Sequence, residues 1–95
     1  MTEQIVCLDY DGTYNKFQGL CHLMIDYCKK NKIKIILATM RSKLEVNEEL
    51  YNLEKILDGV YYTNRKAKSE YLLREHGIVP SIWLDDQPFF IYKDG

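Results

Sequence analysis

The stretch Ile5-Val6-Cys7-Leu8-Asp9-Tyr10-Asp11-Gly12-Thr13 decides how this chain folds, and its first four residues form a short apolar run. A run of this kind, rich in β-branched residues and followed by the turn signal Asp11-Gly12, predicts a buried β-strand. Two carboxylates, those of Asp9 and Asp11, directly follow the strand. Asp-Gly pairs are common in ordinary turns, so this pair alone indicates only a change of chain direction.

Outward from this stretch, short apolar runs alternate with segments of helical periodicity. The further strands that we expect are Ile33 to Ala38, Val60 to Thr63, Ser81 to Leu84 and a short fifth strand, Phe89 to Tyr92; the expected helices are Phe17 to Lys30, Leu44 to Leu57 and Lys66 to His76. This alternation predicts right-handed crossovers and a parallel sheet flanked by helices. The predicted fold class is α/β, a three-layer α/β/α sandwich on a mostly parallel five-stranded sheet, in one domain over residues 1–95.

The composition argues against several classes of function. Thirteen basic and 14 acidic residues give a net charge of −1, so we expect no general attraction for nucleic acid or anionic membranes. The apolar runs are too short to span a bilayer, and the N-terminal residues lack the pattern of a signal peptide. The three cysteines have neither zinc-site spacing nor the even number of a disulfide framework. We therefore expect a cytoplasmic protein that does not bind membranes.

Polar side chains gather at the ends of the expected strands. Those that follow strands are Asp9, Asp11, Thr39, Arg41, Asp85 and Asp86, and two lysines, Lys66 and Lys68, open the helix before the fourth strand. Because the carboxyl ends of parallel strands meet at one edge of a sheet, these groups are expected to lie together. Four carboxylates at one edge repel one another unless a divalent cation lies among them, and their hard oxygen atoms favour Mg²⁺.

Four motifs in this order resemble the signature of the haloacid dehalogenase-like (HAD) superfamily. They are Asp9-Tyr10-Asp11-Gly12-Thr13, which matches DxDGT; Ile36-Leu37-Ala38-Thr39, an apolar strand ending in Thr; a lysine at the start of a helix; and Leu84-Asp85-Asp86. The tail from Lys68 through Gly77-Ile78 to Asp85-Asp86-Gln87-Pro88 is similar to that of HAD nucleotidase-like proteins. The resemblance covers nearly the whole chain and implies a Mg²⁺-dependent phosphatase that forms an aspartyl-phosphate.

The resemblance also implies which carboxylates do the chemistry. Asp9 would attack phosphorus, and Asp11 would protonate the leaving oxygen and then activate water. The side chains of Asp9, Asp85 and Asp86, together with the backbone carbonyl of Asp11, would hold Mg²⁺.

Other matching residues would bind the phosphoryl group or the rest of the substrate. The phosphate-binding residues implied by the family are Thr39, Lys68 and Gly12, which would stabilise charge on the phosphoryl oxygens. The spacing to Gly77 favours Lys68 over Lys66 as the family's lysine. Further candidates for substrate binding are Arg41, Lys66 and Thr13.

The chain departs from most HAD hydrolases because it has no room for a cap domain. Only Tyr14, Asn15 and Lys16 separate Thr13 from the first helix, and the segment 59–66 is equally short. An open site suits a bulky phosphorylated substrate, such as a nucleic-acid end or a phosphoprotein, and leaves nucleotides and other small molecules as candidates. Alternatively, a second copy of the chain covers the site in a homo-oligomer.

Two alternatives belong to other classes of protein. A phospho-receiver domain also collects acidic residues, Thr and Lys at a sheet edge, but its acceptor aspartate ends the third strand, where this chain has Thr63-Asn64. A catalytically weak HAD-fold protein that binds phosphate or metal, in a regulatory role, would keep the fold and hydrolyse little. The presence of Asp11, the expected proton-transfer group, favours the enzyme.

Overall fold

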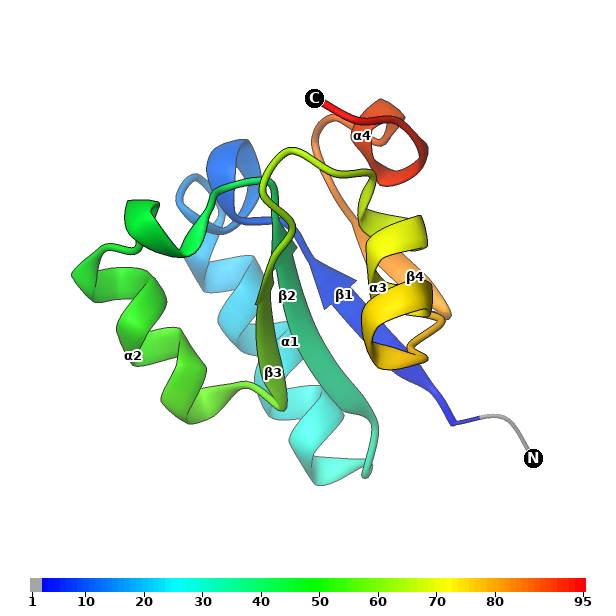
Figure 1. The fold of residues 1–95 in the computed structure, drawn as a ribbon. Coiled ribbons are helices and arrows are strands. Elements are labelled where there is room, and N and C mark those ends of the chain that lie inside the picture. Colours follow the sequence, from blue (N-terminus) through cyan, green and yellow to red (C-terminus); the bar gives the residue numbers. More distant parts are fainter. Residues whose placement is uncertain (1–2) are drawn as a thin grey trace.

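The structure, a computed structural model, describes residues 3–95 (Figure 1). Its main elements are β1 Ile5–Leu8, α1 Gln18–Lys30, β2 Lys34–Thr39, α2 Glu48–Ile56, β3 Gly59–Tyr62, α3 Lys68–His76, β4 Ile82–Leu84 and α4 Phe89–Tyr92. A helical turn, Tyr10–Tyr14, follows β1, and a second short turn, Lys43–Glu45, precedes α2. The predicted α/β alternation is confirmed. Within residues 3–95, no helix has the length and apolar character needed to cross a membrane.

The four strands form a parallel sheet in the order β3-β2-β1-β4. Leu8 of β1 pairs with Leu37 of β2 on one side and with Leu84 of β4 on the other. The chain therefore builds outward from β1 through β2 to β3, and then crosses to the opposite side of β1 to form β4. This reversal makes the end of β1 the topological switch point, where ligands bind in open parallel sheets.

Both faces of β1 are covered by helices, which explains why the strand is apolar throughout. Val6 and Leu8 belong to a core cluster that includes Cys21 and Ile25 of α1 and Leu50 and Leu53 of α2. The alternate residues Ile5 and Cys7 pack with Leu72 of α3 in a second cluster. Strands buried on both faces lack the polar alternation of a half-exposed sheet.

The predicted fifth strand is wrong, because Phe89–Tyr92 forms the short helix α4. Pro88, with φ of −60°, suits the start of a helix, and the backbone N–H of Ile91 donates to its carbonyl oxygen at 3.1 Å. Ile91 is the buried residue of this helix, which packs against α3. A run of four apolar residues fits a strand or a helix equally well, so tertiary contacts decide between them.

Two helix boundaries also differ from the prediction. The helix expected over Leu44 to Leu57 is divided, because Ser42 caps the turn Lys43–Glu45 and Asn47 caps α2 separately. The helix expected from Lys66 begins at Lys68 instead. The reason is Ala67, whose φ of −55° and ψ of 126° are not helical, so the regular helix can begin only after it.

Candidate active site

Asp9 lies directly after β1, at the switch point of the sheet. Its backbone N–H donates to the carbonyl oxygen of Leu84 at 2.9 Å, which extends the pairing of β1 with β4 by one residue. Asp85 follows Leu84, so the two aspartates leave neighbouring strands side by side. The arrangement of the sheet thus brings together two residues that lie far apart in the sequence.

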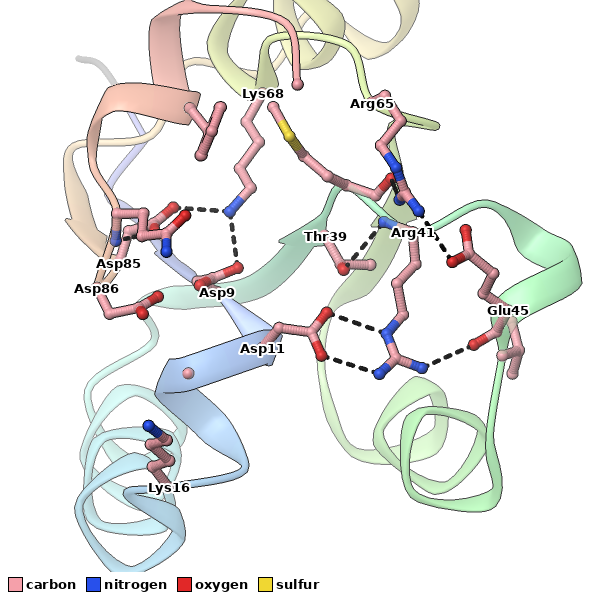
Figure 2. Close-up of a pocket in the computed structure, with 16 residues that line it drawn as sticks. Asp9, Asp11, Lys16, Thr39, Arg41, Glu45, Arg65, Lys68, Asp85 and Asp86 are labelled. Carbon is pink, nitrogen blue, oxygen red and sulfur yellow. Dashed lines mark hydrogen bonds and ion pairs between the residues drawn. The ribbon is translucent and has the colours of Figure 1, made fainter.

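Lys68 joins these two carboxylates. Its Nζ atom donates to Oδ1 of Asp9 and to Oδ2 of Asp85, each at 2.7 Å (Figure 2). All three side chains are buried: 4% of Lys68, 9% of Asp9 and 3% of Asp85 is exposed. One ammonium facing two buried carboxylates leaves an excess negative charge, which a further cation would balance.

The acidic cluster consists of Asp9, Asp85 and Asp86. One carboxylate oxygen of each lies within 4.8 Å of the others. The cluster contains neither cysteine nor histidine, and an all-oxygen set of this kind suits a hard divalent cation. It can therefore hold a metal ion, and Mg²⁺ fits its chemistry. The metal ligand expected from Asp11 was its main-chain carbonyl, and that expectation stays a prediction.

Burial shifts the protonation of the two central groups. It raises the pKa of Asp9 to about 7 from an ordinary value of 3.8, and the ammonium of Lys68 opposes part of this rise. Burial also favours the neutral amine of Lys68, but attraction by Asp9 and hydrogen bonds to both carboxylates outweigh it and raise the pKa of Lys68. Lys68 is thus held as a cation, while the charged form of Asp9 gains from any added positive charge.

Thr13 holds Asp86 in position, and Gly12 leaves room for its carboxylate. The buried hydroxyl of Thr13 lies 3.2 Å from Oδ2 of Asp9 and 3.3 Å from Oδ1 of Asp86, and it accepts from the backbone N–H of Asp86 at 3.1 Å. Gly12 has a φ of +80°, and a Cβ atom there would lie 2.3 Å from Oδ2 of Asp86. The left-handed backbone favours glycine at this position, and a larger residue would push the Asp86 carboxylate aside. Thr13 is buried, and its role as a candidate for substrate binding stays a prediction.

The side chain of Asp11 lies away from the acidic cluster and contacts Arg41 (Figure 2). Arg41 donates from Nε to Oδ2 of Asp11 at 3.0 Å and from Nη2 to Oδ1 at 2.8 Å. The remaining Nη1 donates to the backbone carbonyl of Glu45 at 3.0 Å. This two-pronged pair is partly open to water, with 53% of the Asp11 side chain and 27% of the Arg41 side chain exposed.

Glu45 and Arg65 continue this outer network, and sequence reasoning gave neither residue a role. Oε2 of Glu45 accepts from Nη2 of Arg65 at 3.0 Å, and Nη1 of Arg65 donates to the carbonyl oxygen of Met40 at 2.6 Å. The spacing Ser42-x-x-Glu45 matches a capping box, which the structure contains, so this signal was available for Glu45. No comparable local pattern marks Arg65, because its place depends on contact between two loops.

Thr39 ends β2 on the other side of β1. It is buried, and its hydroxyl accepts from the backbone N–H of Arg41 at 3.3 Å. In Figure 2 its side chain lies between the acidic cluster and the outer network. The site therefore combines a buried carboxylate next to a buried ammonium, an acidic group that could hold a metal ion, and a second, exposed carboxylate.

These groups surround one open cleft of about 870 Å³. Eight of the ten candidate residues line it, namely Asp9, Asp11, Gly12, Thr39, Arg41, Lys68, Asp85 and Asp86. Lys66 instead lines a separate hollow of about 300 Å³, because it lies in the turn before α3. Lys16, Glu45 and Arg65 line the cleft although the sequence did not single them out.

Comparison with known proteins gives no further guide to this site. No family model matches the chain, and neither a curated protein nor a solved structure matches it significantly.

Proposed function

We propose that this protein is a Mg²⁺-dependent phosphomonoesterase that works through an aspartyl-phosphate on a HAD-like, three-layer fold. The observation that carries the proposal is the position of Asp9. It is a buried carboxylate at the switch point of the sheet, 2.7 Å from the ammonium of Lys68 and in one oxygen cluster with Asp85 and Asp86. A nucleophile, a cation for the phosphoryl oxygens and a metal-binding group thus adjoin one another, which is what covalent phosphoryl transfer requires.

The proposed reaction has two displacements. In the first, an oxygen of Asp9 forms a bond to phosphorus while the bond from phosphorus to the leaving oxygen breaks, and Asp11 donates a proton to that oxygen. In the second, Asp11 takes a proton from water, and the water oxygen attacks phosphorus and displaces Asp9. The products are the free alcohol and inorganic phosphate, and both aspartates return to their starting states. Lys68 and Thr39 stabilise the charge on the phosphoryl oxygens.

The metal would be held by Asp9, Asp85 and Asp86. When bound, Mg²⁺ supplies positive charge that offsets both the acidic cluster and the incoming phosphoryl group. This role fits the excess of buried carboxylates over ammonium groups around Lys68. Thr13 holds Asp86 beside Asp9 through hydrogen bonds, and Gly12 leaves room for the Asp86 carboxylate.

One observation favours the alternative, a phosphate- or metal-binding protein with little turnover. Both carboxylate oxygens of Asp11 accept hydrogen bonds from Arg41, rather than facing Asp9. Proton transfer to a leaving group therefore requires Asp11 to part from Arg41, at least at one oxygen. The pair is exposed, so water and substrate can compete for both partners.

The test is turnover of a generic aryl phosphate by the purified protein. We expect hydrolysis in the presence of Mg²⁺, its loss on addition of EDTA and its return when excess Mg²⁺ is added. The matched control is the Asp9→Asn protein under the same conditions, which excludes a contaminating phosphatase. Binding of inorganic phosphate with Mg²⁺ but without turnover of aryl, nucleotide, sugar or oligonucleotide phosphates would establish the binding-protein alternative instead.

A further inference from the structure

One wall of the cleft has no part in the proposed chemistry. It is built around Arg65, whose backbone N–H and Nη1 both donate to the carbonyl oxygen of Met40, at 2.9 and 2.6 Å. The side chains of Met40 and Phe90 both lie next to Gly95, and both residues line the cleft. In Figure 2, Arg65 is on the opposite side of Thr39 from the acidic cluster. This wall therefore combines the Arg65 cation, which lies apart from the acidic cluster, with the apolar side chains of Met40 and Phe90.

Arg65 keeps this position in an unfavourable backbone conformation. Its φ is 70°, a left-handed value that arginine seldom adopts. Lys32 also has a positive φ, 56°, but it follows the end of α1, where a left-handed residue ordinarily ends a helix. Arg65 follows β3, so no helix end accounts for its conformation. Strain of this kind, at a residue lining a cleft, points to a functional role for the side chain.

The guanidinium of Arg65 retains donors for a ligand. It donates once to Met40 and once to Glu45, while 52% of the side chain stays exposed. A guanidinium has five N–H donors, and its planar fork matches two oxygens of a phosphate. Glu45 is an exposed partner that an incoming anion can displace.

This inference rests on the proposed phosphatase function. We propose that this wall binds the leaving group of the substrate, and that this leaving group carries a second phosphate. Arg65 takes the second phosphate, and the apolar surface of Met40 and Phe90 takes the nucleobase. The substrate is then a nucleotide unit phosphorylated on both its 3′ and its 5′ oxygen. A free nucleoside 3′,5′-bisphosphate and the phosphorylated end of an oligonucleotide share this chemistry, and the open cleft admits both.

The test compares kcat/KM for a nucleoside 3′,5′-bisphosphate, the two matching monophosphates and a short oligonucleotide phosphorylated at either end. We expect the wild-type protein to prefer the doubly phosphorylated substrates by roughly 10-fold, the effect of one hydrogen-bonded charged contact. Arg65→Gly, which relieves the backbone strain and so keeps the fold, should abolish this preference and change monophosphate turnover by less than about twofold. Arg65→Lys should retain part of it. Comparing kcat/KM for the bisphosphate with kcat/KM for the oligonucleotide then shows whether the substrate is a free nucleotide or a nucleic-acid end.

Lys66→Ala is the matched control, because Lys66 is the neighbouring cation and lies outside the cleft. Lys66→Ala should leave the ratio of kcat/KM between doubly and singly phosphorylated substrates unchanged. Glu45→Gln, which removes the competing charge but keeps an acceptor for Ser42, should lower KM for the bisphosphate by up to roughly fivefold. If Arg65→Gly lowered kcat/KM equally for mono- and bisphosphates, Arg65 would only hold the loops together, and the proposal would be overturned. An unchanged ratio of bisphosphate to monophosphate kcat/KM in Arg65→Gly would overturn it as well.

Failure of this inference can be told apart from failure of the phosphatase proposal. If the wild-type protein hydrolyses aryl phosphate with Mg²⁺ but treats all nucleotides alike, only the second-phosphate site is wrong. If it hydrolyses nothing, calorimetric titration of the Asp9→Asn protein with the same bisphosphate and monophosphates still tests whether Arg65 binds the second phosphate. Tighter binding of the bisphosphate, lost in the Asp9→Asn, Arg65→Gly double variant, would support it, and equal binding would contradict it.

Discussion

Two sides of the cleft are held by ion pairs of similar length in opposite surroundings. On the inner side, Lys68 contacts Asp9 and Asp85 at 2.7 Å, and all three side chains are buried. On the outer side, Arg41 contacts Asp11 at 2.8 Å in a pair that water reaches. Breaking a buried pair costs about 3–5 kcal/mol, whereas an exposed pair contributes ~0–1 kcal/mol. The surroundings therefore decide what each pair does. The inner pair stabilises the fold and keeps Lys68 charged, and the outer pair can exchange partners with a substrate.

The largest effect should come from the inner side, at the nucleophile. Asp9→Asn keeps an oxygen that accepts from Lys68 but removes the charged attacking atom. We expect phosphatase turnover to fall by about 10⁴-fold or more, as for other essential nucleophiles, with the circular dichroism spectrum unchanged. Asp26→Asn on the exposed face of α1 is the control and should retain full activity. Near wild-type turnover in Asp9→Asn would exclude the covalent mechanism.

The two lysines near α3 give the next largest contrast. Lys68→Met leaves the carboxylates of Asp9 and Asp85 buried without their cation. Turnover should fall by ~10²–10³-fold, the effect of losing a preorganised donor to the transition state, and urea denaturation should show a loss of about 3–5 kcal/mol. Lys66→Met, the same change at an exposed position, should alter stability by less than about 0.5 kcal/mol. A reversed pair of results would mean that Lys66, not Lys68, serves the site.

The residues on the inner side of the cleft are also those whose positions could be predicted from the sequence. Asp9 and Asp85 each follow an apolar run, and parallel strands place such residues at one edge whatever the loop details. Lys68 was open to confusion with Lys66, because a helix start shifts easily by two residues. The non-helical backbone at Ala67, which delays the start of α3, has no clear signal in the sequence.

The outer side depends on contacts that no local pattern specifies. The pairing of Arg41 with Asp11, and of Glu45 with Arg65, joins three loops whose geometry follows from the finished sheet. The strand predicted at Phe89–Tyr92 was wrong for a related reason. Contact of this segment with α3, and not its apolar character, determines that it is helical. Strand ends were thus predictable from the sequence, and loop-to-loop contacts were not.

A smaller effect tests the burial of Asp9 directly, through the pH dependence of stability. Its pKa of about 7 lies above the ordinary value of 3.8, so the folded protein holds the proton more tightly than the unfolded chain. The stability from this group is complete below about pH 4 and is lost as the pH rises through 7. In EDTA at pH 8, Asp9→Asn should therefore raise Tm by at least ~4 °C, or about 1 kcal/mol, with little difference at pH 4. The same Tm difference at both pH values would show that Asp9 is not destabilised by burial.

The smallest expected effect lies in the outer pair, and salt separates it from the inner one. Arg41→Gln removes an exposed ion pair, so the free energy of unfolding should fall by less than about 1 kcal/mol. Raising the ionic strength from 0.1 to 1 M shortens the Debye length from about 10 to about 3 Å. The stability difference between Arg41→Gln and wild type should then shrink further.

The difference between Lys68→Met and wild type should persist in 1 M salt, because those groups are shielded from solvent ions. Urea denaturation of the three proteins at both ionic strengths measures this contrast. A salt-resistant loss of more than about 2 kcal/mol in Arg41→Gln would mean that the outer pair supports the fold as the inner one does. Asp11 would then be fixed by Arg41 rather than available to a leaving group, and the binding-protein alternative would become the better account of the site.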